Sequence, residues 1–424
     1  MKLCFLIDIH SPIARNWVSR FIQGGHDVHI ISSYPCTADT LPGASIHWVP
    51  IAFSRFSRAG RATLPGPKKI KILVSSVMAN FRSVAFTNLS SIKHHWLAPL
   101  ELHRHIKTVR NLIELVSPDL IHAMRIPFEG IVASIATPSR FPLLISVWGN
   151  DFTLHASPYP LVGWQTRQAM QRADALHCDC RRDLYLAQSW GFRPDKPATV
   201  LPSGGGIQAW LFYPGPHSLK LRQQLEIPAE ATVVINPRGY RSYIRNDTFF
   251  QAIPFVLQAR PKTIFICTEM QSNPDAEKWT KQMSISHNVR LLPLIPREQM
   301  AELFRLAQVT VSPSIHDGTP NTLLEAMACG CFPVAGDIES VREWIEDGIN
   351  GLLCDPASPE AIAKAILKAL YDKKLRENAQ GYNIKLIAER AEYEMVMKKA
   401  EEFYHQVLEH HQERRAMTKN TNEC

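Results

Sequence analysis

The chain has 424 residues, a formal net charge of +8 and 45% hydrophobic residues. This length predicts two or three domains, each with enough apolar material for a core of its own. The near-average apolar content, with 20% charged residues, excludes a disordered or fibrous protein. No run approaches the ~20 apolar residues that a membrane-spanning helix requires.

The N-terminal run over residues 1–10 is apolar, but Asp8 interrupts it, so it is too short for a signal peptide and is expected to form a buried first strand. The nine cysteines are odd in number, and no pair has CxxC spacing. The two CxC pairs lack the second ligand pair that a zinc site needs. We therefore expect reduced thiols, no metal site and a cytoplasmic protein.

Short apolar runs alternate with amphipathic stretches along the whole chain. Continuous β-branched strands separated by helices are typical of parallel sheets that helices cover on both faces. The sequence therefore predicts an α/β protein with two Rossmann-like, doubly wound domains facing across a cleft. The expected strands are Lys2–Ile9, Asp27–Ser32, Asp119–Ala123, Phe141–Val147, Asp174–Cys178, Thr232–Asn236, Lys262–Cys267, Asn288–Leu292, Val309–Ser312 and Phe332–Ala335.

A glycine triplet flanked by prolines, residues 202–216, predicts the linker between the two domains. We expect an N-terminal domain over residues 1–205 and a C-terminal domain over residues 206–382. A long charged helix over residues 383–410 and a polar, frayed tail over residues 411–424 are expected to follow.

The positive charge is concentrated in one segment. Between Arg55 and Arg110 the chain has eleven Lys and Arg residues against one acid, Glu101. Such a segment favours an anionic partner, which could be a membrane surface at the inner face of the cell membrane, a phosphorylated acceptor or a nucleic acid; a solvated basic loop is the alternative. The chain has no RNP-like or helix-turn-helix signature, so we expect no nucleic-acid partner.

Ligands of doubly wound domains bind beyond the carboxyl ends of the parallel strands. Polar residues follow several of the expected strands in both halves, among them His122, Asp151 and Arg238. We expect these side chains in the cleft. A core histidine is the alternative interpretation of His122, and a turn residue is the alternative for Asp151.

The most informative segment runs from residue 309 to 356 and predicts a strand, a Gly/Pro loop and a helix that ends at Gly330. The first amides of that helix carry the positive end of its dipole, which makes them a site for an anion such as a diphosphate. The residues expected to form this site are Gly318, Thr319, Pro320, Asn321, Thr322 and Leu323.

Two acids flank this anion site. Glu325, one helical turn further on, is expected to accept hydrogen bonds from two ribose hydroxyls, because a carboxylate among apolar neighbours is costly without a partner. Asp317 precedes the loop and is expected to reach past the phosphates; a helix-capping acid is its alternative role.

This segment resembles the signature of family-four retaining glycosyltransferases, which have the GT-B fold of two Rossmann-like domains. The resemblance rests on Asp317 and Glu325, seven residues between them, with a Gly-x-Pro loop after the first acid. It extends to the Ala-Met-Ala-x-Gly-x-x-Pro-Val-Ala run over residues 326–335 and to Asp-Gly-x-Asn-Gly-Leu-Leu over residues 347–353. The first family acid is commonly Glu, whereas this chain has Asp317.

The resemblance implies a nucleotide-sugar donor in the C-terminal domain, a UDP- or GDP-sugar, and an acceptor in the N-terminal domain, either a glycan or a lipid-linked molecule. It also implies retained anomeric configuration, no cofactor, and a diphosphate held by Arg238 and Arg245, with Arg241 as a competing candidate for the second position. Residues 119–122, which end in His122, and residues 146–151, which end in Asp151, resemble strand-end motifs of the family.

The expected catalytic residues are therefore His122, Asp151 and Asp317, and the expected product is a polysaccharide or glycolipid. The chain has no Asp-x-Asp motif, the usual metal handle for nucleotide sugars, so two guanidiniums and a helix N-terminus are expected to neutralise the leaving diphosphate. A catalytically weakened nucleotide-sugar-binding or scaffold protein of the same fold is the alternative function.

Overall fold

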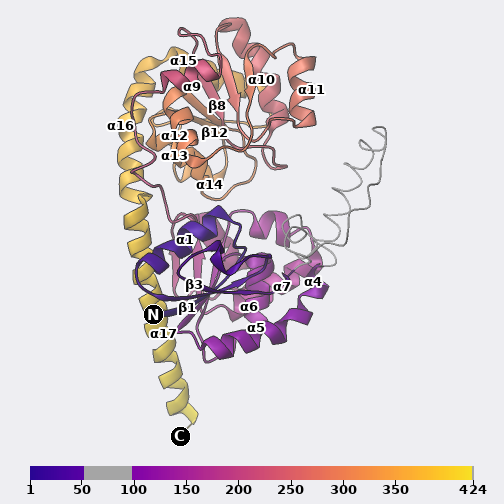
Figure 1. Ribbon diagram of the computed structural model, residues 1–424, viewed down its shortest axis with the longest axis vertical. Coiled ribbons are helices and arrows are strands. Elements are labelled where there is room, and N and C mark those ends of the chain that lie inside the picture. The colour runs from indigo at the N-terminus through magenta and orange to yellow at the C-terminus, as the bar shows by residue number, and fades with distance from the viewer. Residues whose placement is uncertain (52–97, 423–424) are drawn as a thin grey trace. The chain divides into compact units, whose positions relative to one another are not determined.

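The computed structural model describes residues 1–51 and 98–422 (Figure 1). The chain forms two compact units: Met1–Gly205 together with Met397–Cys424 is unit 1, and Gly206–Val396 is unit 2. The first passage between the units therefore falls inside the glycine triplet at residues 204–206.

Unit 1 is built on a parallel seven-stranded sheet with the order β3-β2-β1-β4-β5-β6-β7. Its elements are β1 (Lys2–Ile7), α1 (Pro12–Gln23), β2 (Asp27–Ser32), η1 (Ala38–Thr40), β3 (Ala44–Trp48), α4 (Ala98–Glu101), α5 (His103–Val116), β4 (Leu120–Ala123), η4 (Ile126–Gly130), α6 (Ile131–Ala136), β5 (Leu143–Val147), η5 (Asp151–Ala156), α7 (Pro160–Arg172), β6 (Ala175–Cys178), α8 (Arg181–Ser189) and β7 (Ala198–Val200).

Alternate residues of these strands enter two different cores, as the two-residue period of a strand requires. Cys4 and Leu6 of β1 face one core, which α5, α6 and α7 cover. Phe5 faces the other side, where its ring lies 5.9 Å from that of Phe21 on α1. Both faces of the sheet are buried, which explains the continuous apolar runs in the sequence.

Unit 2 has a parallel six-stranded sheet with the order β10-β9-β8-β11-β12-β13. Its elements are α9 (Leu219–Gln224), β8 (Val233–Asn236), α10 (Asn246–Ala259), β9 (Ile264–Cys267), α11 (Pro274–Gln282), β10 (Val289–Leu291), α12 (Arg297–Leu306), β11 (Val309–Ser312), α13 (Asn321–Ala328), β12 (Phe332–Gly336), α14 (Glu339–Arg342), β13 (Leu352–Cys354), α15 (Pro359–Tyr371) and α16 (Lys373–Arg390). Val234 of β8 packs with α10 and α15, whereas Val233 and Ile235 pack with α12 and α13.

The prediction of two doubly wound α/β domains is confirmed, and all ten expected strands are present within a few residues of their predicted ends. The sequence analysis missed β3, β7 and β13. Each lies at the edge of its sheet, and two of the three have only three residues. Edge strands are often short and half exposed, so they lack the continuous apolar run on which the prediction depended.

The predicted single helix over residues 383–410 is wrong. Helix α16 ends at Arg390, and a separate helix, α17 (Tyr393–Asn422), begins after two intervening residues. The break arises because Ile207 pairs with this segment: its amide donates to the carbonyl of Ala391 at 2.6 Å, and the amide of Tyr393 donates to its carbonyl at 3.0 Å. The expectation of a frayed tail over residues 411–424 is also wrong for the described residues, because they continue helix α17.

The basic segment between Arg55 and Arg110 lies mostly outside the described residues. Its described end is α5, where Arg104, Lys107 and Arg110 are exposed. Docking on an anionic membrane stays a prediction. Within the described ranges, no helix is both long enough and apolar enough to span a bilayer.

One buried hydroxyl, that of Tyr404, joins helix α17 to the rest of unit 1. The Tyr404 ring stacks on Phe21 with centroids 4.6 Å apart. Its Oη accepts a hydrogen bond from Trp17 Nε1 at 2.9 Å and lies 2.5 Å from Nδ1 of His122. Tyr404 is fully buried, so its hydroxyl has no access to water as a substitute partner.

Tyr404→Phe is therefore expected to destabilise unit 1 by about 1–3 kcal/mol, because the indole N–H and the imidazole nitrogen both lose their partner in a buried place. Urea denaturation followed by tryptophan fluorescence measures this, with the transition of unit 1 fitted separately. Tyr185→Phe, at an exposed position on α8 of the same unit, is the matched control and should change stability by less than about 0.5 kcal/mol. Equal effects of the two substitutions would contradict the anchoring role.

Candidate functional site

The order of strands reverses between β8 and β11 in unit 2, and this switch point is where open α/β sheets bind ligands. Arg238 follows the end of β8, and Asp317 lies in the loop after β11. Gly239 has a φ of +63°, and a Cβ there would lie 2.7 Å from Oε2 of Glu269. Glycine therefore allows the turn that presents Arg238 at the switch point.

Arg238 and Asp317 form a buried ion pair. Nη2 of Arg238 donates to Oδ2 of Asp317 at 2.5 Å, and Nη1 donates to Oγ1 of Thr322 at 2.8 Å. The two charged side chains are only 10% and 11% exposed. A buried guanidinium requires such compensation, so an incoming anion must share Arg238 with Asp317 or displace it.

The loop before α13 is shaped by its own polar groups. The amide of Gly318 donates to Oδ1 of Asp317 at 3.1 Å, and Oγ1 of Thr319 accepts from Nε1 of Trp344 at 3.3 Å. Pro320 caps α13, and Gly330 follows its end with a φ of +85°, as the sequence predicted.

Helix α13 begins at Asn321, so the amides of Asn321 and Thr322 belong to its first turn. Leu323 is fully buried, and its amide already donates to the carbonyl of Pro320 at 2.8 Å. The expectation that Leu323 offers a free amide to a ligand is therefore wrong. Fewer amides at this end of the helix are open to a ligand than the sequence predicted.

Glu325 is 91% buried on α13, and its carboxylate has a partner that the sequence analysis missed. Nη2 of Arg297, on α12, donates to Oε1 of Glu325 at 3.0 Å, and Nη1 of Arg297 donates to Oε1 of Gln208 at 2.8 Å. Burial raises the pKa of Glu325, while the charges of Arg297 and Arg238 lower it. Arg297 therefore favours the ionised form and fixes the direction of the carboxylate.

Arg245 does not join the Arg238 cluster. Its guanidinium makes two hydrogen bonds with the carboxylate of Asp247, at 2.9 and 2.8 Å, two residues further along the chain. Arg241, the competing candidate, pairs with Glu269 at 3.3 Å. Arg238 is thus the basic residue that the described structure brings to Asp317, Thr322 and the first turn of α13.

In unit 1, His122 is buried rather than open to a ligand. It is 1% exposed, and both ring nitrogens have partners: Nδ1 contacts Oη of Tyr404, and Nε2 contacts Oγ of Ser146 at 2.7 Å. Ser146 in turn contacts Nδ1 of His177 at 2.8 Å, and Nε2 of His177 contacts the carbonyl of Leu201 at 2.9 Å. The prediction of His122 as a catalytic residue is not supported by this geometry.

The donor and acceptor of each hydrogen bond in this series follow from its last group, the carbonyl of Leu201. The carbonyl of Leu201 can only accept, so Nε2 of His177 carries the proton and Nδ1 accepts from the Ser146 hydroxyl. The oxygen of Ser146 then accepts from Nε2 of His122, and Nδ1 of His122 accepts from the Tyr404 hydroxyl. All donors and acceptors are satisfied when both histidines are neutral.

Asp151 is likewise buried, with 1% exposure. Its Oδ1 accepts from Nε of Arg125 at 3.0 Å, and its Oδ2 accepts from the amides of Ile126 and Trp148 at 3.3 and 3.1 Å. Burial raises the pKa of Asp151, and Arg125 and the two amides oppose that rise. Asp151 therefore positions Arg125 and two strand-end turns, and its expected catalytic contact is not supported.

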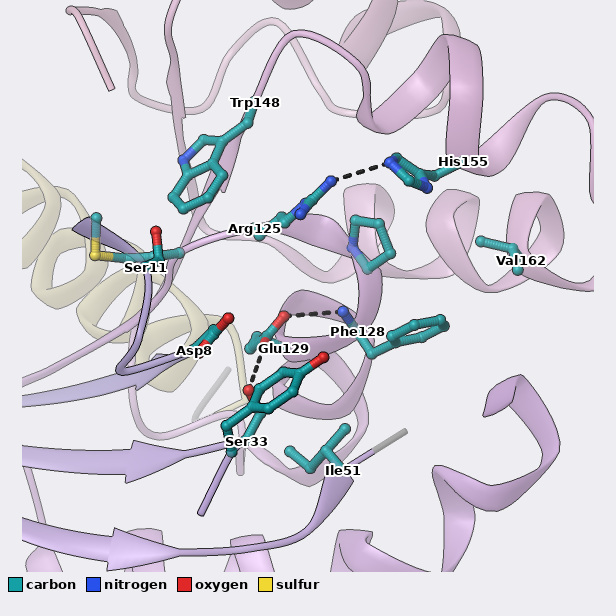
Figure 2. Close-up of a pocket in the computed structure, with 13 residues that line it drawn as sticks. Asp8, Ser11, Ser33, Ile51, Arg125, Phe128, Glu129, Trp148, His155 and Val162 are labelled. Atoms are coloured by element: carbon teal, nitrogen blue, oxygen red, sulfur yellow. Dashed lines mark hydrogen bonds between the residues drawn. The ribbon is translucent and has the colours of Figure 1, made fainter. Parts of the chain in front are cut away.

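Arg125 borders a cavity of about 360 Å³ at the switch point of unit 1, beyond the carboxyl ends of β1, β4 and β5 (Figure 2). The residues that line the cavity come after strands β1 to β5. They are Asp8, Ser11, Ser33, Tyr34, Ile51, Met124, Arg125, Pro127, Phe128, Glu129, Trp148, His155 and Val162. The sequence analysis missed this cavity, because its walls come from six separate chain segments.

Two doubly wound units, each with polar residues gathered at its switch point, define the class of two-domain Rossmann-like proteins. Residues 11–204 match the glycosyl transferase 4-like domain, and residues 219–386 match glycosyl transferases group 1. The chain belongs to this family of glycosyltransferases, and the resemblance noted in its sequence is confirmed.

Curated relatives and solved structures agree with this assignment. The D-inositol 3-phosphate glycosyltransferase of Geodermatophilus obscurus is 32% identical over 49% of this chain and 48% of that protein, and the enzyme of the same name from Thermobifida fusca is 24% identical over 45% and 46%. The chain thus spans about half the length of the curated relatives it matches.

The structural neighbours share the fold over nearly the whole chain. Sucrose-phosphate synthase from Thermosynechococcus elongatus has a TM-score of 0.72 at 16% identity, covering 96% of this chain and 99% of that one. Anabaena HepE in complex with UDP has a TM-score of 0.68 at 16% identity, covering 95% and 99%.

The buried histidines predict a pH dependence of stability. Burial lowers the pKa of His177 from 6.5 to about 4, and burial and the neighbouring His177 lower the pKa of His122 well below its usual value. Between pH 6.5 and 4 the unfolded chain therefore binds protons that the folded chain does not, so this contribution to stability falls as the pH falls.

We expect His177→Gln, which keeps one donor and one acceptor but does not titrate, to remove about 2–3 kcal/mol of this loss at pH 4.5. The measurement compares the free energies of unfolding of both proteins at pH 7.5 and 4.5. On going from pH 7.5 to 4.5, the free energy of unfolding should fall less for the variant than for the wild type. An equal fall in both proteins would show that His177 does not resist protonation.

Proposed function

We propose that the protein is a glycosyltransferase that moves a sugar from a nucleoside-diphosphate sugar to a hydroxyl-bearing acceptor. The observation that carries the proposal is the buried Arg238 at the switch point of unit 2, beside the first turn of α13 and the carboxylate of Glu325. Solved structures of HepE with UDP and with UDP-glucose support a UDP-sugar as the donor.

In this proposal Arg238 and the first amides of α13 hold the diphosphate, and Glu325 accepts hydrogen bonds from the ribose hydroxyls. As the bond between the anomeric carbon and the diphosphate oxygen breaks, the departing oxygen gains negative charge, which Arg238 neutralises. Asp317, released from Arg238 when the diphosphate binds, is then available for a hydroxyl of the donor sugar.

The proposed transfer retains the anomeric configuration and needs no metal. The acceptor oxygen forms its bond on the same face that the diphosphate leaves, and the acceptor proton passes to the departing phosphate oxygen. A covalent route would need a carboxylate nucleophile below the anomeric carbon. Formation of a polysaccharide or glycolipid is the proposed role, and the cavity of unit 1 is the proposed acceptor site.

The first test is UDP binding measured by isothermal titration calorimetry. Arg238→Gln is expected to weaken UDP binding and to lower donor turnover by about 10²–10³, the usual effect of removing one charge-stabilising donor. Arg260→Gln, a change of the same chemistry on the far end of α10, is the control and should leave both unchanged. Equal UDP affinity in wild type and Arg238→Gln would refute the proposed donor site.

Asp317→Asn should change the affinity for UDP in the opposite direction. Removing the carboxylate frees Arg238 and removes a negative charge next to the diphosphate, so we expect UDP to bind about tenfold more tightly. Transfer from UDP-glucose should nevertheless fall, because the contact with the donor sugar is lost. Weaker UDP binding by this variant would show that Asp317 does not compete for Arg238.

A further inference from the structure

The cavity of unit 1 has walls suited to a small organic ligand. Its volume of about 360 Å³ lies at the lower end of the range of small-molecule pockets. Tyr34, Phe128 and Trp148 contribute aromatic rings, and Ser11 and Ser33 contribute hydroxyls. Aromatic faces beside hydrogen-bonding groups suit a sugar ring, which has both C–H faces and hydroxyl edges.

Two carboxylates decide the charge of this cavity. Figure 2 shows Asp8 and Glu129 side by side on the opposite side of the cavity from His155. Glu129 is 94% buried, and its oxygens accept hydrogen bonds from Oγ of Ser33 at 2.5 Å and from the amide of Phe128 at 2.9 Å. Burial raises the pKa of Glu129, and the charge of Asp8 raises it further, which places the two acids within electrostatic reach of each other.

The positive charge at the cavity is already matched. Arg125 borders it from the other side, but its Nε donates to Asp151 at 3.0 Å, and its Nη2 contacts Nε2 of His155 at 3.0 Å. Asp151 is fully buried and pairs with Arg125, so this carboxylate offsets the charge of the guanidinium. Among the described residues that line the cavity, Asp8 and Glu129 are therefore the carboxylates that a ligand meets, beside one guanidinium that Asp151 already pairs.

Carboxylates accept hydrogen bonds from hydroxyl and ammonium groups but repel phosphate. Repulsion between like charges in a partly buried cavity costs enough binding free energy to exclude an anionic ligand. A phosphorylated polyol, such as the one named for the curated relatives, would place its anionic group among these acids.

We infer that the cavity of unit 1 binds a sugar without a phosphate group, neutral or amine-bearing, and that Asp8 and Glu129 reject a phosphorylated one. The role of this sugar as the acceptor rests on the proposed function. The charge preference itself rests only on the cavity and can be measured without any donor.

The test uses three ligands with one ring: glucose, glucosamine and glucose 6-phosphate. Saturation-transfer difference NMR with the full chain should give transfer from glucosamine and glucose, and a dissociation constant for glucose 6-phosphate at least about tenfold weaker than for glucosamine. Asp8→Asn should narrow this ratio about fivefold. Glu402→Gln, an exposed position on α17, is the control and should leave the ratio unchanged.

Tighter binding of glucose 6-phosphate than of glucosamine would overturn the inference, and so would no transfer from any of the three sugars. An unchanged ratio in Asp8→Asn would overturn the role of the acid pair. Calorimetry with UDP on the same protein separates this result from the proposed function: UDP binding with a preference for the phosphorylated sugar rejects only the acid-pair inference, whereas no UDP binding rejects only the donor site.

Discussion

The buried ion pair between Arg238 and Asp317 is the interaction on which the account of unit 2 depends. A guanidinium at the switch point of a parallel sheet is surrounded by strand ends and a helix N-terminus. Because a buried charge without a partner is costly, an acidic group of the protein or of a ligand must compensate it. Asp317 meets it in this structure. The ion pair thus gives Arg238, the residue proposed to hold an anion, a partner within the protein.

Unit 1 uses its strand ends in two different ways. At the ends of β4 and β5, His122 and Asp151 are turned into the protein and fully bonded, one to Tyr404 of α17 and the other to Arg125. Next to them, a cavity lies beyond the ends of β1 and β4, and Asp8 and Glu129 are among the residues that line it. Buried, satisfied groups hold the turns in place, and the groups left at the cavity can contact a ligand.

Much of this could be predicted from the sequence, and the exceptions have physical reasons. The buried strands of both sheets were predictable from their continuous apolar runs, and the grouping of Arg238, Asp317 and Glu325 followed from strand ends and one helix start. The link between Arg297 and Glu325 was not, because nothing local to either residue signals contact between α12 and α13.

Long-range partners also changed the interpretation of single residues. The hydroxyl that occupies Nδ1 of His122 belongs to Tyr404, 282 residues further along the chain, so no local pattern could show that the ring is buried. Arg245 is the opposite case, and its role at a diphosphate stays a prediction. Its partner Asp247 lies only two residues away and was visible in the sequence, but the resemblance to a family motif outweighed it.

The most direct test of the central claim is a crystal structure of the protein with UDP bound. The account predicts that the β-phosphate lies within hydrogen-bonding distance of the Arg238 guanidinium and the first amides of α13, that Glu325 contacts the ribose, and that the contact between Arg238 and Asp317 is broken or shared. A diphosphate bound elsewhere, with the Arg238–Asp317 pair intact, would contradict it.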